Sequence, residues 1–250
     1  MAIQKTQGFV LRREDIRETS ILLTAYTLDF GKIKLISKGV RSPDQRFISA
    51  YEIFALCDLV FYEKKKSDFF FLSQCELIEF FPKVRESLEK LSYAVYFSEL
   101  LNSVTPMGEA NRDLYRLMLD CLSLISGKAS PKRVARIFEI KLLSILGFMP
   151  SITQCVGCGS AYEKKIARFS ISSGGVLCEK CFNKDKAARG VLAGSINFIS
   201  HIESMPFDRV KNIKVARRVG SEVERLLKDF INYHLDIRLR SMEFIRKAGV

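Results

Sequence analysis

Four cysteines in two pairs are the residues of this chain best suited to a defined chemistry. Cys155 and Cys158 frame a Val-Gly turn, and Cys178 and Cys181 frame a Glu-Lys turn after nineteen further residues. Two such pairs at this separation are typical of one tetrahedral zinc ion held by four thiolates. Iron–sulfur ligation, or a ribbon held by disulfides, is the alternative interpretation.

A zinc site of this kind is expected to be structural. Catalytic zinc keeps one coordination position open for water or substrate, and four cysteines fill every position. His201-Ile-Glu203 has the letters of a nucleobase-deaminase motif, but it follows both cysteine pairs. Because the chain also lacks a phosphate-binding loop and a Gly-x-Ser-x-Gly motif, we expect that it is not an enzyme. A metalloenzyme, which needs an open zinc site, is the less favoured hypothesis.

The second group of chemical interest is a set of cations near the N-terminus. The chain has 40 Lys and Arg residues against 28 Asp and Glu, a formal net charge of +12, which indicates a polyanionic partner. In the segment GKIKLISKGVR, residues 31–41, three lysines alternate with apolar residues. A strand with this alternation presents Lys32, Lys34 and Lys38 on one face. The simple alternative is a solvated outer face that binds nothing.

Export and membrane signals are not expected in this sequence. The first residues, MAIQKTQGFVLRRED, lack the apolar stretch of a signal peptide. The longest uncharged run, residues 142–162, contains Pro150 and three glycines, so it is a poor membrane span. We therefore expect a cytoplasmic, nucleoid-associated protein with reduced thiols and no membrane partner.

The N-terminal part of the chain is predicted to form a barrel that positions the basic residues. Between residues 3 and 80, five short β-rich runs are separated by turn signals and by no long helix, at 8–13, 20–28, 32–40, 53–62 and 69–77. Five such strands favour the oligonucleotide-binding (OB) barrel, and an SH3-like barrel is the alternative.

After Pro82 the apolar residues recur with a helical period. Helices are predicted over 88–102, 114–125, 134–146, 196–203 and 210–244. The predicted fold class is α+β with several domains. Its predicted parts are an OB-fold barrel over 1–80, a helical domain over 81–150 and 190–250, and a zinc-ribbon insertion over 151–189.

Several short motifs occur in a recognisable order along the chain. They are Gly8-Phe9-Val10-Leu11-Arg12, Ser37-Lys38-Gly39-Val40-Arg41-Ser42-Pro43, Leu146-Gly147-Phe148, Ser173-Gly174-Gly175 and Leu239-Arg240-Ser241. Together with the cysteine pairs, they make the chain resemble the bacterial recombination-mediator family RecO along nearly its whole length.

The resemblance implies a function that composition does not show. It implies an ATP-independent DNA-binding mediator of repair that anneals complementary strands and assists RecA loading onto single-stranded DNA coated by single-stranded-DNA-binding protein (SSB). The implied partners are single- and double-stranded DNA, RecR, the C-terminal tail of SSB and, indirectly, RecA. The alternative function is a zinc-ribbon protein-interaction adaptor of the transcription or translation machinery.

With this resemblance, the basic segment is predicted to bind DNA phosphates. The predicted DNA-binding residues are Lys34, Lys38, Arg41, Arg46, Arg12 and Lys5. Barrels of this type add stacking of bases on aromatic rings, for which the candidates are Phe9, Tyr26 and Phe47. Core packing is the alternative role of these three rings. One structural Zn²⁺ is predicted on Cys155, Cys158, Cys178 and Cys181.

Overall fold

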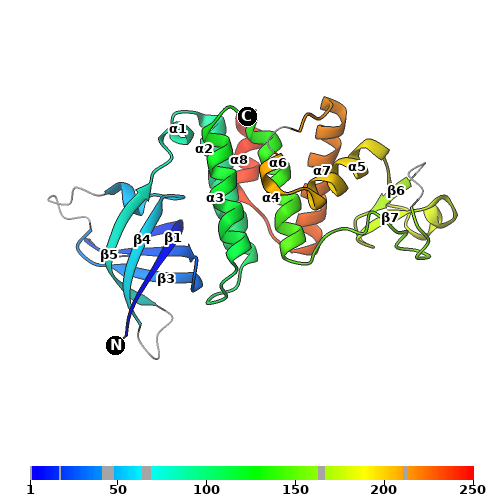
Figure 1. The fold of residues 1–250 in the computed structure, drawn as a ribbon. Helices are drawn as coiled ribbons and strands as arrows, with labels where there is room; N and C mark the ends of the chain where they lie inside the picture. The colour runs from blue at the N-terminus through cyan, green and yellow to red at the C-terminus, as the bar shows by residue number, and fades with distance from the viewer. Residues whose placement is uncertain (1, 17, 41–47, 64–68, 163–166, 211–212) are drawn as a thin grey trace. The chain divides into compact units, whose positions relative to one another are not determined.

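The structure is a computed structural model that describes residues 2–16, 18–40, 48–63, 69–162, 167–210 and 213–250 (Figure 1). The chain divides into two compact units. The first unit consists of residues 1–131 together with 239–250, and the second consists of residues 132–238. The finer division into barrel, helical domain and zinc ribbon stays a prediction.

The first unit contains a closed barrel of five strands in the order β1-β2-β3-β5-β4 (Figure 1). The strands are β1 (Ala2–Asp15), β2 (Ile21–Thr27), β3 (Gly31–Ser37), β4 (Leu56–Glu63) and β5 (Phe70–Glu79), with the 3₁₀ helix η1 (Ile48–Tyr51) before β4. Strands β3 and β5 pair in parallel, and β1 closes the barrel against β4. This topology is that of the OB barrel, so the predicted OB-like fold is confirmed.

Apolar side chains at alternate positions of the strands fill the interior of the barrel. In β3, Ile33 and Leu35 point inward and are buried, as the period of two requires. β1 serves two neighbours, because its first half pairs with β4 and its second half with β2. Its register against β2 shifts between Val10 and Arg12, the kind of bulge that lets one strand bend around a barrel.

Helices α1 (Pro82–Arg85), α2 (Leu88–Val104) and α3 (Arg112–Ser126) follow the barrel within the same unit. Ser87 and Asn111 accept backbone N–H bonds as the N-caps of α2 and α3. The loop between these helices lies against the β2–β3 turn, where Gly108 N donates to Lys32 O at 2.8 Å. A side chain on Gly31 would collide with the backbone of Glu109, which explains the glycine at this turn.

The second unit combines helices with a small sheet. Its helices are α4 (Pro131–Ile145), α5 (Ala193–Ser204), α6 (Phe207–Val210) and α7 (Arg217–His234). Its sheet consists of β6 (Ala167–Ser170), β7 (Gly175–Leu177) and β8 (Arg189–Val191), in the order β7-β6-β8. Inside α4, Arg136 pairs with buried Glu139 at 2.6 Å and reaches Glu224 of α7 at 3.5 Å. Across both units, no described helix is both long enough and apolar enough to cross a bilayer.

One predicted helix is wrong in its extent. The sequence indicated a continuous helix over 210–244, but α7 ends at His234 and α8 (Arg240–Ala248) starts a new helix. Asp236 takes a φ of +48°, which an α-helix does not allow, so the chain breaks here. The boundary between the two compact units falls inside this break.

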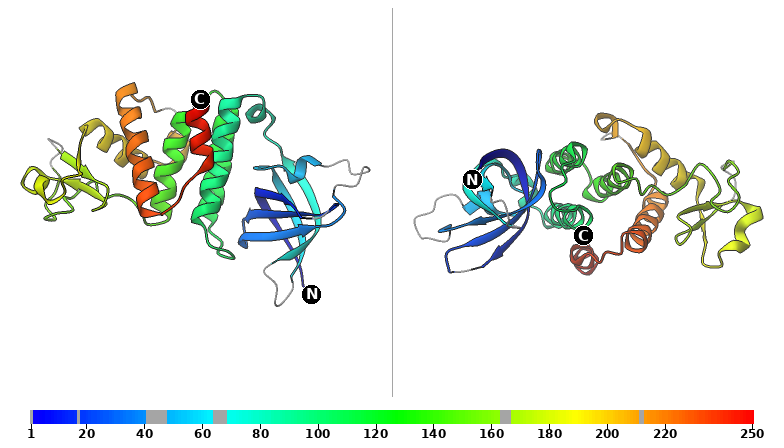
Figure 2. Two further views of the ribbon diagram at one scale, coloured as in Figure 1. Left: turned by 180° about the vertical axis from the view of Figure 1, so that it is seen from behind. Right: turned by 90° about the horizontal axis from the view of Figure 1, so that it is seen from below.

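Helix α8 returns to the first unit and packs against α2; it is the red helix in Figure 2. The Glu99 carboxylate of α2 accepts N–H bonds from Arg240 at 3.0 Å and Ser241 at 2.9 Å. It also accepts the hydroxyl of Ser241. Glu99 thereby caps the first turn of α8 with a charge that also suits the positive end of the helix.

Replacing Glu99 by alanine should therefore loosen α8. Removing the side chain that caps a helix N-terminus costs about 0.5–2 kcal/mol, because water replaces part of the lost hydrogen bonding. We expect a loss of about 1–2 kcal/mol, measured as faster amide exchange over residues 240–248. Glu243→Gln, which alters an exposed carboxylate of the same helix, should change exchange by a few tenths of a kcal/mol at most. Equal exchange in the two variants would contradict this role of Glu99.

Candidate metal centre and nucleic-acid interface

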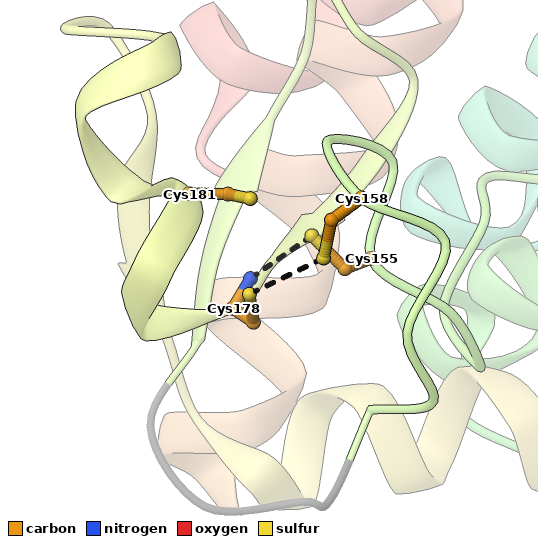
Figure 3. A group of neighbouring side chains, drawn as sticks. All are labelled: Cys155, Cys158, Cys178 and Cys181. Atoms are coloured by element: carbon orange, nitrogen blue, oxygen red, sulfur yellow. Dashed lines mark hydrogen bonds between the residues drawn. The ribbon is translucent and has the colours of Figure 1, made fainter.

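The four predicted ligand cysteines lie together in the second unit (Figure 3). Their Sγ atoms are all within 4.8 Å of one another, and those of Cys158 and Cys178 are 3.7 Å apart. Four sulfurs bound to zinc at about 2.3 Å form a tetrahedron with edges of about 3.8 Å. The donor set and its spacing therefore fit a metal ion with four thiolate ligands.

Each cysteine pair sits on a tight turn. Cys155 Sγ accepts N–H bonds from Gly157 and from Cys178, each at 3.3 Å, so the backbone of both turns points at this sulfur. A side chain on Gly157 would lie 3.0 Å from both Cβ and Sγ of Cys181. Glycine at this position is therefore what lets the first turn approach the ligands of the second.

The hydrogen bonds favour ionised sulfur at the first turn. The hydroxyl and N–H of Ser160 lower the pKa of Cys158 to about 6. Burial raises the pKa of Cys155, but N–H donors from Cys178, Gly157 and Cys158 outweigh it and lower the pKa overall. Burial and the three neighbouring cysteines raise the pKa of Cys181 to about 12. Four thiolates this close repel one another unless a cation balances them.

A small scaffold holds the two turns. It consists of β6 (Ala167–Ser170), β7 (Gly175–Leu177), β8 (Arg189–Val191) and the 3₁₀ helix η2 (Glu179–Lys184) that carries Cys181. Val156 N donates to Val176 O at 2.9 Å, which fixes the first turn on β7. The buried cluster here consists of Cys155, Leu177, Cys181 and Ala188, so two of the four ligands are also core residues. A bound metal would add to the small apolar core of this scaffold.

The predicted cationic face lies on the outside of the barrel. Lys34 and Lys38 project outward from β3 and its end, and each ammonium lies over a phenylalanine ring of the β5 region. The distances to the ring centroids are 5.4 Å from Lys34 to Phe69 and 5.1 Å from Lys38 to Phe71. Among the described residues, neither lysine forms an ion pair with a carboxylate. Both charges are therefore available to an anionic ligand.

Lys32 differs from the other two lysines of its strand. Its ammonium donates to Asn102 O, in the C-terminal part of α2, at 2.6 Å. Burial, and then the charge of Lys34, lower its pKa. Lys32 is thus a structural contact between the barrel and α2. The face that carries the three lysines is covered at Lys32 and accessible at Lys34 and Lys38.

The remaining predicted DNA-binding residues have different settings. Lys5 is exposed on β1, opposite Val60 of β4. Arg12 is exposed, is paired with Glu14 at 2.9 Å, and lines a cavity of about 480 Å³ with residues of α2 and α8. Register through Thr24 places Arg12 in the same row as Lys34. Arg41 and Arg46 lie outside the described residues. The assignment of all six residues to DNA stays a prediction.

Two family models match the chain, and between them they cover most of it. The model described as "Recombination protein O N terminal" matches residues 1–81, and "Recombination protein O C terminal" matches residues 85–243. The chain belongs to the RecO family.

Named RecO relatives match over the whole length. A DNA repair protein RecO of Pelotomaculum thermopropionicum is 33% identical, over 100% of this chain and 96% of the relative. The protein of the same name from Desulforudis audaxviator is 32% identical, over 98% and 97%. That from Symbiobacterium thermophilum is 30% identical, again over 98% and 97%. The resemblance read from the motifs is therefore confirmed, and the chain is a RecO-family DNA repair protein.

The aromatic residues of this RecO chain are not placed as the sequence suggested. Phe9 and Tyr26 are fully buried where the barrel meets the helices, and the Phe9 ring is 5.2 Å from that of Tyr115 in α3. They cannot stack on bases, so core packing, the alternative role, is correct for them; Phe47 lies outside the described residues. Sequence reasoning missed Phe69 and Phe71. The signal was the run of three consecutive phenylalanines at 69–71. When the middle ring of such a run points into the barrel, the two flanking rings must point outward.

Proposed function

We propose that this protein is an ATP-independent mediator that binds single- and double-stranded DNA and anneals complementary strands. In this proposal it is not an enzyme, and it assists RecA loading onto single-stranded DNA coated by SSB. The observation that carries the proposal is the open pair Lys34 and Lys38 on an OB barrel of a RecO-family chain. RecR and the C-terminal tail of SSB are the proposed protein partners.

The chemistry of such a mediator is reversible binding of phosphates. Lysine and arginine side chains that neutralise phosphates release condensed counterions, and this release supplies affinity without sequence preference. The binding weakens steeply with salt, and it uses no nucleotide hydrolysis. A strand held in this way can be delivered to a complementary strand and then released.

The proposed metal is one structural Zn²⁺ on Cys155, Cys158, Cys178 and Cys181. Four thiolates satisfy the tetrahedral preference of zinc, and no ligand position remains for water or substrate. Its role is to hold the two turns and η2 in one geometry, while the barrel binds DNA.

A strand-annealing assay tests the proposed function. The purified protein, without ATP, should accelerate pairing of two complementary fluorescent oligonucleotides by at least about tenfold, because bound cations reduce the repulsion between the two strands. The acceleration should fall as salt rises.

The alternative adaptor function predicts the opposite result in the same assay. An adaptor whose ligand is another protein would leave the annealing rate at that of the strands alone, at low salt as well as at high salt. Bovine serum albumin at equal concentration is the control for non-specific effects. No acceleration in dilute buffer would refute the mediator proposal.

A further inference from the structure

A row of apolar and aromatic side chains crosses the outer face of the barrel. The strand register places Ile3 of β1 opposite Tyr62 of β4, and Tyr62 opposite Phe71 of β5. Residues directly opposite each other in neighbouring strands share a face of the sheet. Ile3 is 63% exposed, Tyr62 is 36% exposed, and Phe71 is half-buried. Three large side chains in one exposed row call for a ligand that they can contact.

The core of the barrel does not account for the phenylalanines of this face. Phe70 points inward, where its ring lies 5.3 Å from that of Phe61 and packs on the barrel core. Because side chains alternate along a strand, its neighbours Phe69 and Phe71 point outward. Outward positions of a half-exposed strand are usually polar. Two aromatic rings at such positions, two residues apart, indicate a binding surface.

Cations accompany the rings. The ammonium groups of Lys34 and Lys38 lie over Phe69 and Phe71, and Lys5 lies in the next row, opposite Val60. A contact between an exposed ammonium and a ring is weak, whereas an ammonium binds a phosphate by a charge-assisted hydrogen bond. A nucleotide can therefore draw each lysine to its phosphate and place its base against the ring that the lysine leaves.

The part of the barrel beside this row is closed to a ligand. Phe9, Tyr26 and Lys32 belong to the outer face of β1, β2 and β3, and they are covered by residues of the α2–α3 segment. The exposed Tyr62 and the half-buried Phe71 instead lie on β4 and β5. Tyr62 lies near the end of β4, and Phe69 directly precedes β5.

We propose that Tyr62, Phe69 and Phe71 form a base-stacking row for unpaired nucleotides of a single strand. This inference rests on the DNA binding proposed above. It adds a physical reason why the protein would bind single-stranded DNA more tightly than duplex DNA. In a duplex the faces of the bases are stacked on one another, so a duplex can offer phosphates, sugars and base edges but no free base face to an aromatic ring. An unpaired strand contacts the lysines through phosphates and the rings through bases.

A tryptophan reporter tests stacking directly, because the chain contains no tryptophan. In Phe71→Trp, oligothymidylate should quench the indole fluorescence, since stacked bases quench it. An abasic strand of equal length and charge should leave it nearly unchanged. Ile78→Trp is the matched control, because Ile78 lies on the same strand and face, at the other end, and is 43% exposed. Equal quenching by both strands, or at both positions, would overturn the proposal.

Affinity measurements separate stacking from phosphate binding. The double variant Phe69→Leu/Phe71→Leu should bind oligothymidylate at least about fivefold more weakly, because each stacked base contributes appreciably. Its affinity for duplex DNA, and its salt dependence, should stay the same, since no phosphate contact is removed. Because duplex binding requires the lysines of a folded barrel, retained duplex binding also shows that the barrel of the variant is intact. Phe71→Tyr, which keeps the aromatic ring, should bind as the wild type does.

The possible failures can be told apart. A wild-type chain that binds neither oligothymidylate nor duplex at low salt refutes the proposed DNA binding itself. A chain that binds both by way of its lysines, with the leucine variant equal to wild type, refutes only the stacking row.

Discussion

Replacing Cys181 by serine should remove the metal and unfold the ribbon around it. The wild-type protein should carry about one zinc ion per chain, and the variant much less than one. The expected effect is large, because structural zinc contributes on the order of 10 kcal/mol to the folding of small domains. Here the buried cluster of the ribbon includes two ligands, Cys155 and Cys181, so little apolar packing would remain. Metal analysis and amide exchange over residues 151–191 measure the two results.

Exchange elsewhere in the chain provides the internal control for this experiment. Barrel amides should keep their protection in Cys181→Ser, since the barrel has its own core in the other compact unit. Cys75→Ala, which removes a half-buried barrel thiol, should keep the full zinc content. Purified wild-type protein that contains no metal and shows normal protection over 151–191 would refute the zinc assignment. Iron in place of zinc would support the iron–sulfur alternative instead.

Reversing the charges of Lys34 and Lys38 should produce the second large effect. In Lys34→Glu/Lys38→Glu, affinity for a single strand should fall at least about tenfold at moderate salt, because two attractive charges become repulsive. The slope of log affinity against log salt should become shallower by about 1.4, which corresponds to about 0.7 for each lost phosphate contact. Fluorescence anisotropy titrations at several salt concentrations measure both quantities.

A control variant with the same net charge as Lys34→Glu/Lys38→Glu separates a local phosphate contact from the effect of the protein's overall charge. Lys83→Glu/Lys128→Glu changes two exposed lysines of the same unit and alters the net charge equally. Its affinity should fall by only about twofold, and its slope should match the wild type. If the two double variants behave alike, the charge of the whole protein matters and the barrel face is not the binding surface.

The cysteine site was predictable because its signal is local. Both turns are short, and the spacing of Cys155, Cys158, Cys178 and Cys181 alone identifies the four candidate ligands that the structure brings together. The barrel was also predictable, since alternation in β3 reflects burial on one side of a strand. The parallel pairing of β3 with β5, which decides between barrel types, has no local signal and came only from the structure.

Long-range contacts explain what the sequence could not show. Lys32 and Lys34 look alike in the sequence, and only the carbonyl of Asn102, far along the chain, makes Lys32 structural. Tyr26 is unavailable for stacking because its ring is fully buried, with its hydroxyl bonded to the backbone of Asn111. The break between α7 and α8 was missed for another reason. The apolar period continues past it, while the conformation of Asp236 depends on where the next helix packs.

Helix α8 also has a consequence for biosynthesis. It completes the packing around α2, yet it leaves the ribosome only after all of residues 132–238 have been made. The nascent first unit must therefore wait with an uncovered face on α2, a state in which chaperones can bind it. Shortening the chain before residue 240 should damage this early-synthesised unit while sparing the later one.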